Sequence, residues 1–143
     1  MKLRRLHANA GVAVCLLFAG CSAASASKMN PRSTTPPTVS YDRSCEKTAA
    51  YQPAMNHCAG LELSELEGQL TPALAKDAKL FGPTAVKKVQ AAWTTYRDKE
   101  CALEESTYKD GTIQPLILED CEITLTAQRI LAIREVLAEH AGD

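Results

Sequence analysis

Four cysteines are the residues of this chain whose type and spacing point most directly to chemistry: Cys45, Cys58, Cys101 and Cys121. Cysteine thiolates bind zinc in close pairs such as C-x-x-C, but the gaps here are 13, 43 and 20 residues, which disfavours a metal site. His57 beside Cys58 suggests a base and a nucleophile, yet neighbours on a helix point about 100° apart. An even number of cysteines in a short exported chain is typical of disulfides, and we expect two.

The pairing of these cysteines is not fixed by their number, because four cysteines allow three pairings. We favour Cys45–Cys58 with Cys101–Cys121, since each bridge would then tie a helix to an adjoining loop or helix start. Loops of this size stabilise a fold by roughly 3 kcal/mol each in the chain-entropy model.

Two groups of acidic residues are the other candidates for chemistry. Both are interpreted as solvated helix faces and not as metal ligands; they comprise Glu62, Glu65 and Glu67, and Asp98, Glu100, Glu104 and Glu105. The chain also has no Gly-rich loop that would cradle phosphate. We therefore expect no enzyme, no metal, no cofactor and no small-molecule substrate.

The first 20 residues indicate an export signal, with basic residues before an apolar run too short to span a bilayer. Phe18-Ala19-Gly20-Cys21 resembles a lipobox, in which the cysteine is acylated, although Phe18 stands where an aliphatic residue is usual. We expect a lipid-anchored protein of the cell envelope, periplasmic or surface-exposed. The alternative is a soluble secreted or periplasmic protein cleaved after the A-x-A pattern that ends at Ala26.

The mature chain divides into a tether and one domain. Residues 21–40 are expected to be a lipidated cysteine and a disordered tether, because prolines and small residues dominate there. Residues 41–143 are expected to form the domain. Removal of the signal leaves 13 basic and 17 acidic residues, a net charge of about −4 that disfavours a nucleic-acid partner.

Apolar residues with helical spacing predict a small all-α domain of three antiparallel helices. A first stripe begins near Pro53 and keeps its phase across Pro72, which favours one kinked helix over a new helix capped by Thr71. Its members are Met55, Ala59, Leu63, Leu66, Leu70 and Leu74. Gly82-Pro83 predicts a stop, with glycine in a left-handed cap.

The second predicted helix spans 84–108, and the third runs from about Pro115 to the C-terminus. The second is expected to bury Val86, Val89, Trp93 and Tyr96, and the third Ile123, Ala127, Ile130, Ile133 and Leu137. Leu118, Cys121 and Leu125 lie on nearly the opposite face of the third helix. We expect the preceding loop to cover that start.

Several residues together resemble the LprI-like lysozyme-inhibitor family, formerly a domain of unknown function. The resemblance covers about 45–137 and rests on the four cysteines with M-N-x-C-A at Met55-Asn56, W-x-x-Y-R-D-x-x-C at 93–101, and T-x-x-R at 126–129. The motif residues expected to be structural are Met55, Asn56, Trp93, Tyr96, Arg97, Asp98, Thr126 and Arg129. Arg97 shares a row with Trp93 and Cys101, so we expect it to be partly buried with a carboxylate or carbonyl partner.

The resemblance implies an envelope protein that binds and inhibits lysozyme, with a non-inhibitory scaffold or adaptor lipoprotein as the alternative. Many lysozymes are cationic, so acidic residues would steer association. The predicted contact surface is the segment between Cys101 and Cys121, with Gly111 permitting a tight turn. Its candidate residues are Glu104, Glu105, Asp110, Gly111 and Thr112, with the acidic face around Glu62 and Glu65 as the alternative.

Overall fold

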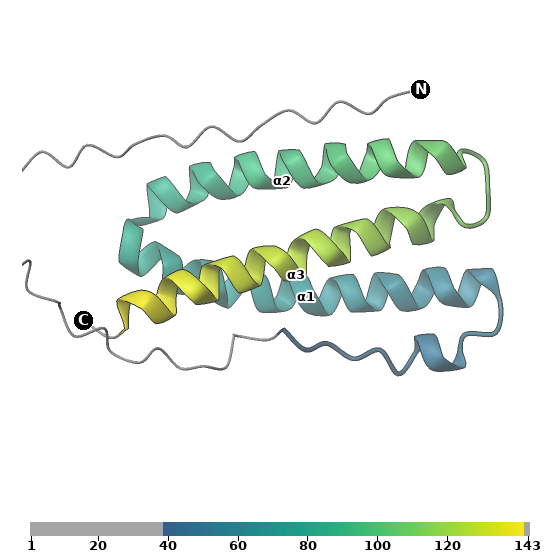
Figure 1. Cartoon of the computed structure of the whole chain (residues 1–143), viewed down its shortest axis with the longest axis horizontal. Helices are drawn as coiled ribbons and strands as arrows, with labels where there is room; N and C mark the ends of the chain where they lie inside the picture. Colours follow the sequence, from purple (N-terminus) through teal and green to yellow (C-terminus); the bar gives the residue numbers. More distant parts are fainter. Residues whose placement is uncertain (1–38, 142–143) are drawn as a thin grey trace, which may run out of the picture. The chain divides into compact units, whose positions relative to one another are not determined.

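Three antiparallel helices form the domain in a computed structural model, which describes residues 39–141 (Figure 1). A short 3₁₀ helix, η1 (Glu46–Thr48), precedes α1 (Gln52–Phe81), α2 (Pro83–Glu105), the 3₁₀ helix η2 (Ser106–Tyr108) and α3 (Gln114–His140). The predicted all-α, three-helix class is confirmed. The predicted export signal, the lipidation of Cys21 and nearly all of the tether lie outside the described residues.

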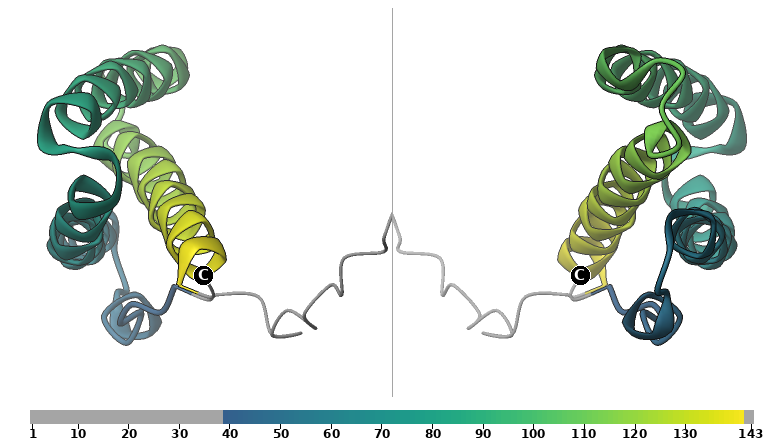
Figure 2. Two further views of the ribbon diagram at one scale, coloured as in Figure 1. Left: turned by 90° about the vertical axis from the view of Figure 1, so that its left-hand side faces the viewer. Right: turned by 90° about the vertical axis from the view of Figure 1, so that its right-hand side faces the viewer.

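The core lies mainly between α1 and α3, which pack along most of their lengths. Leu66, Ile130 and Ala59 are fully buried there, as the helical spacing of both predicted stripes required. Views along the bundle show α2 on one side of this pair, and η1 on the side away from α2 (Figure 2). Within residues 39–141, no helix is long and apolar enough to cross a membrane.

Both predicted disulfides are present, which settles the choice among three pairings. Cys45 is bonded to Cys58 and ties the segment before η1 to the first turns of α1. Cys101 is bonded to Cys121 and ties the last turns of α2 to the first turns of α3. Helix α2 therefore covers Cys121 through this bond, whereas the expectation for the rest of the start of α3 stays a prediction.

Helix α1 continues through Pro72, as the unbroken stripe predicted. Pro72 is exposed on the outer side of the helix, so its ring does not disturb the core. The Thr71 hydroxyl donates to the Glu67 carbonyl at 3.2 Å, one turn back, so Thr71 lies within the helix and does not cap a new one. The helix ends at Gly82, whose positive φ of 87° favours glycine.

The prediction for the buried face of α2 is only partly confirmed. Val89 and Tyr96 are 55% and 53% exposed, so they do not belong to the core. The inward row includes the predicted Val86 and Trp93 together with Cys101, and the polar Gln90 and Arg97 lie between them. Helix α2 also ends three residues early, because Ser106–Tyr108 tighten into a 3₁₀ turn.

Candidate functional site

The five residues predicted to contact a partner lie together in the connection between α2 and α3. Glu104 and Glu105 end α2, and the other three follow η2. All except the half-buried Glu105 are exposed. The Cys101–Cys121 bridge closes this connection at its base, with a sequence separation of 20. We call residues 102–113 the tip segment.

Side-chain hydrogen bonds hold the tip segment in one conformation. The Gln114 amide accepts from the backbone N–H of Asp110 at 3.1 Å and donates to a Glu105 carboxylate oxygen at 3.3 Å. From α1, Asn56 Nδ2 donates to the Thr112 carbonyl at 3.1 Å. Asn56 therefore links the M-N motif to the tip segment and helps to fix the conformation of that segment.

The tight turn of the tip segment depends on Asp110 as well as on the predicted Gly111. Asp110 has a φ of 63°, a left-handed conformation that aspartate tolerates better than most residues. Gly111 serves a steric purpose instead. A Cβ at this position would lie 3.0 Å from the Tyr108 carbonyl oxygen, which accepts the Gly111 N–H. Only glycine fits this close approach comfortably.

Exposed apolar side chains accompany the acids of the tip segment, and the sequence analysis missed them. Leu103, Tyr108 and Ile113 are 69%, 43% and 37% exposed. Ile113 offered a signal, because it lies between the predicted helices and belongs to no stripe. Leu103 offered none, because it follows Val89 and Tyr96 at intervals of seven on a face that was expected to be buried. Tyrosine and large apolar residues on a fixed protrusion are typical of protein-binding surfaces.

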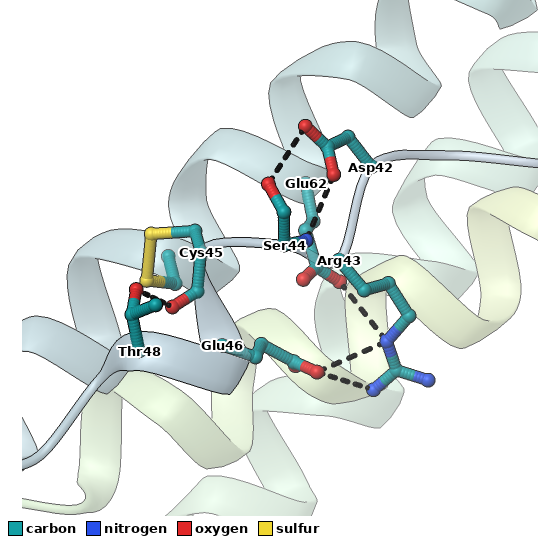
Figure 3. Close-up of a disulfide and its surroundings, with 8 residues drawn as sticks. Asp42, Arg43, Ser44, Cys45, Glu46, Thr48 and Glu62 are labelled. Atoms are coloured by element: carbon teal, nitrogen blue, oxygen red, sulfur yellow. Dashed lines mark hydrogen bonds and ion pairs between the residues drawn. A yellow bond between two sulfur atoms is a disulfide. The ribbon is translucent and has the colours of Figure 1, made fainter.

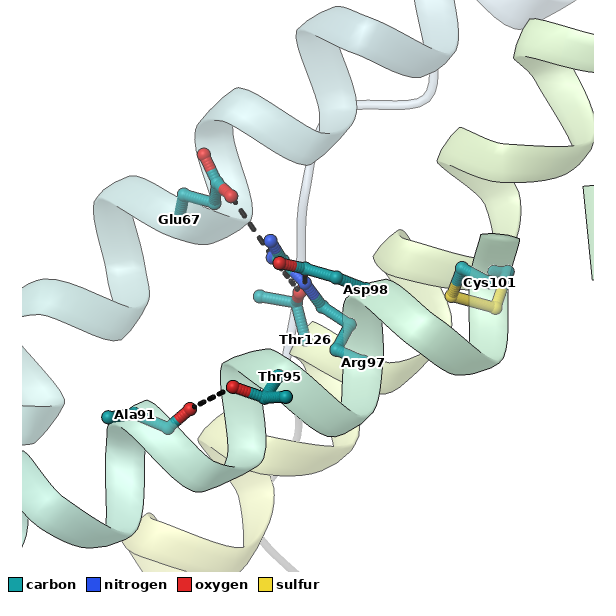
Figure 4. A network of polar contacts seen from close by, with 8 residues as sticks. Glu67, Ala91, Thr95, Arg97, Asp98, Cys101 and Thr126 are labelled. Atoms are coloured by element: carbon teal, nitrogen blue, oxygen red, sulfur yellow. Dashed lines mark hydrogen bonds and ion pairs between the residues drawn. A yellow bond between two sulfur atoms is a disulfide. The ribbon is translucent and has the colours of Figure 1, made fainter. Parts of the chain in front are cut away.

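Arg97, one turn before Cys101 in α2, is the centre of a polar network (Figure 4). Its side chain is only 12% exposed, and it donates to Glu67 and Asp98 carboxylate oxygens, each at 3.1 Å. It also donates to the buried Thr126 hydroxyl at 3.3 Å and lies 5.5 Å from the Trp93 ring centroid. The predicted partial burial with a carboxylate partner is confirmed. Burial acts to lower the pKa of Arg97, but the bonds to Glu67 and Asp98 outweigh it and raise the pKa.

The remaining motif residues contribute in different ways. Met55 is half-buried near the start of α1, and Arg129 donates from Nε to Gln90 at 3.3 Å, which joins α3 to α2. Tyr96 is exposed on the outer face of α2. The motif is therefore mainly a set of contacts between helices.

A second polar cluster joins the N-terminal segment to α1 (Figure 3). Arg43 lies 2.8 Å from Glu46 and 3.7 Å from Glu62, and the Asp42 N–H donates to Glu65 at 3.0 Å. Glu62 is only 2% exposed, and its Oε1 has no hydrogen-bond partner. Glu62 is thus not part of a solvated face, and the alternative contact surface around Glu62 and Glu65 loses its central member.

The two ends of the bundle differ in net charge over the described residues. The end of the bundle that includes the tip segment comprises residues 39–67 and 97–122. It carries 13 acidic and 5 basic residues, a net charge of −8. Residues 68–96 and 123–141, at the other end, carry 3 acidic and 6 basic residues, a net charge of +3. The acidic end could attract a cationic partner over a distance and orient it before contact.

Four carboxyl groups at the acidic end have raised pKa values. Burial is the main cause for Glu62, Glu119, Asp120 and Glu122, and neighbouring carboxylates add to it. Glu119 packs against α1 where Gly60 has no side chain, and its Oε2 has no hydrogen-bond partner. Each of these carboxyl groups binds its proton more tightly in the folded chain than in the unfolded chain.

These groups are therefore expected to add thermal stability as the pH falls from neutral toward their unfolded pKa values of 4.5 and 3.8. A carboxyl group whose pKa is higher in the folded chain than in the unfolded chain stabilises the fold when it is protonated. This stabilisation is fully present below the unfolded pKa values of 3.8 and 4.5, and it is lost as the pH rises through the folded pKa values. Melting curves across this range measure the effect. Glu62→Gln, which is neutral at every pH, should melt higher than the unmodified chain near pH 8 and show a flatter profile. A steeper profile in this variant would contradict the assignment.

The described residues offer little for catalysis or metal binding. The sulfur of Cys58 is in a disulfide, so it is no free nucleophile beside His57. Between residues 39 and 141, no group of three or more His, Cys, Asp or Glu side chains is arranged to hold a metal ion. The arrangement can instead present a fixed, acidic and partly apolar surface.

Comparison with known proteins identifies one family. The family described as lysozyme inhibitor LprI matches residues 45–133, more than half of the chain, and this confirms the resemblance. An uncharacterized protein, R02472, of Rhizobium meliloti (strain 1021) is 34% identical over 53 residues, which are 37% of this chain and 38% of that protein. The match thus spans well under half of the relative's length. No solved structure matches.

Proposed function

Because this chain belongs to the LprI lysozyme inhibitor family, we propose that it binds a cationic lysozyme through the tip segment and blocks its cleft. The observation that carries the proposal is the tip segment itself, which is bridged at its base, hydrogen-bonded to α1 and exposed at its apolar side chains. A fixed protrusion loses little entropy on binding. The protein acts by occlusion and not by catalysis.

The acidic and apolar parts of the tip segment have different tasks. A lysozyme cleft uses two carboxylates, so an inhibitor that inserted its own carboxylates there would meet like charges. The exposed side chains of Tyr108 and Ile113 suit the cleft better, since their burial is favourable and adds no charge. Glu104 and Glu105 then lie at the rim and steer the basic enzyme into place.

An assay of peptidoglycan lysis tests inhibition directly. The purified chain is mixed with several lysozyme types at stoichiometric ratios, and we expect lysis by at least one cationic type to slow. If lysis by every type continues unchanged, the protein is a non-inhibitory scaffold or adaptor of the cell envelope. No observation on the described residues favours that second function over the first.

Binding kinetics separate steering from contact. Glu104→Gln with Glu105→Gln should slow association with lysozyme by roughly ten-fold at low salt and flatten its salt dependence, with a smaller change in dissociation. Asp110→Ala with Thr112→Ala should instead speed dissociation, because both residues lie in the turn. Surface plasmon resonance at low and high salt measures both rates.

Two controls make this comparison specific. Glu135→Gln with Glu139→Gln removes the same charge from the other end of the bundle and should change association much less. Asp110→Asn removes the charge but keeps a residue that tolerates the positive φ of 63°. If the turn variants leave dissociation untouched, the contact surface lies outside the tip segment.

The chain is further proposed to be exported and held at a membrane through acylated Cys21. Cys21→Ser should move the protein from the membrane fraction to the soluble fraction of the cell envelope, because the serine hydroxyl does not replace the acylated thiol. Immunoblots of the two fractions measure this. A mature N-terminus at Ser27 in intact-mass spectra would establish the alternative cleavage site instead.

A further inference from the structure

We propose that the end of the bundle opposite the tip segment docks on the surface of an anionic lipid bilayer. This end contains the α1–α2 turn and the last turns of α3, which lie side by side on the left in Figure 1. We call residues 68–96 and 123–141 the basic end. The inference uses neither the proposed inhibition nor the proposed lipidation.

Two apolar grooves lie on either side of the first turns of α2. The first has a volume of about 410 Å³ and includes Phe81 and Val89, whose side chains are 49% and 55% exposed. The second has a volume of about 650 Å³ and includes Leu74 and Ala78. Val86 lines both grooves. Apolar surface therefore flanks α2 on both sides, where acyl chains could be buried.

The ring of Phe81 is held in place at this surface. It meets the ring of His140 edge-on, with centroids 5.7 Å apart and an angle of 81° between the planes. The end of α3 thus supports the end of α1. A large apolar side chain that is both exposed and ordered can enter the headgroup region without a further loss of conformational freedom.

Basic residues border the grooves. Lys87 lines the second groove, and Lys79 and Lys88 are exposed nearby in sequence. Arg129 lines the first groove together with the acidic Asp77. Lysine side chains can lay their methylene chains along apolar surface while their ammonium groups stay among lipid headgroups. The net charge of +3 attracts anionic lipid, whereas the −8 of the other end is repelled by it. Docking would therefore orient the tip segment away from the bilayer.

A fluid lipid surface fits these grooves better than a second copy of the chain. The acidic end of another copy has the complementary charge, but it is built of rigid helices. A rigid partner would have to fill two grooves separated by α2, which demands a shape that no helix end provides. Acyl chains and headgroups can adapt to both grooves at once.

Site-specific fluorescence tests the orientation on the full chain. Phe81→Trp is compared with Tyr108→Trp in the tip segment, and the unmodified chain supplies the background of native Trp93. Vesicles contain brominated phosphatidylcholine with or without phosphatidylglycerol. We expect quenching and a blue shift of the tryptophan at 81 only when phosphatidylglycerol is present, and no added quenching at 108. Circular dichroism checks that each variant is folded.

Charge variants in the Phe81→Trp background test the role of the lysines. Lys87→Gln with Lys88→Gln should raise the lipid concentration for half-maximal quenching about 25-fold, at about five-fold for each lysine. Lys47→Gln with Lys99→Gln removes the same charge from the acidic end and should leave the lipid concentration for half-maximal quenching unchanged. Absent quenching at 81, or equal quenching at 81 and 108, would overturn the proposal. Head-to-tail self-association in sedimentation without lipid binding would assign the surface to a second copy.

Discussion

Replacing Arg97 by alanine is expected to lower the free energy of unfolding by about 3 kcal/mol and the melting temperature by roughly 10–20 °C. The substitution leaves the fully buried Thr126 hydroxyl without its charged donor and removes the cation from the Trp93 ring. It also leaves Glu67 and Asp98 close to one another without their shared partner. Thermal and urea unfolding measure the loss.

Two matched variants separate the network from the charge. Arg97→Lys keeps the charge but loses the planar guanidinium, so it should recover only part of the stability. Arg129→Ala removes an arginine whose Nε bonds the neutral Gln90, and it should cost about 1 kcal/mol or less. Lysozyme binding of Arg97→Ala, measured well below its melting temperature, should change less than its stability. Unchanged melting with lost binding would make Arg97 a contact residue.

Helical periodicity in the sequence predicted α1 and α3 well because their apolar stripes are long and face each other. Leu66 and Ile130 show this, since both lie on predicted stripes and both are fully buried. The even number of cysteines also predicted two disulfides, and the sequence favoured the observed pairing among three without fixing it. These features depend on local pattern and chain order, which a single sequence contains.

The buried face of α2 was not predictable in the same way, because it mixes apolar and polar residues. The row through Val86, Trp93 and Cys101 also contains Arg97, whose burial depends on partners from α1 and α3. Val89 and Tyr96 also have helical spacing, so periodicity predicted Val86 and Trp93 correctly and added these two exposed residues wrongly. The contacts that α2 makes with α1 and α3 determine which of its residues are buried.

The predicted contact residues lie together in one segment, but the sequence argument did not indicate the apolar side chains there. Glu104 and Glu105 lie at the end of α2, and the exposed Tyr108 near them was missed, because the sequence argument considered charge alone. The burial of Glu62 was also missed. It requires the N-terminal segment to fold back over α1, and the position of Arg43 near Glu62 depends on that path.

Removing the Cys101–Cys121 bridge is expected to have the second large effect, and the other bridge provides its control. Replacing either pair by alanine should lower the free energy of unfolding by about 3 kcal/mol, because the two closed loops differ little in length. Their sequence separations are 20 and 13. Unfolding in urea, with the two double variants side by side, measures this loss.

The two variants should differ in lysozyme binding although they match in stability. Only the Cys101–Cys121 bridge closes the tip segment at its base. Without this bridge, the connection between α2 and α3 is held by the hydrogen bonds of Asn56 and Gln114 and no longer by a covalent bond. The tip segment must then be ordered on binding, and we expect dissociation to accelerate about ten-fold. The Cys45–Cys58 variant, measured well below its melting temperature, should dissociate like the unmodified protein. Equal acceleration in both variants would mean that overall stability, and not the fixed shape of the tip segment, limits binding.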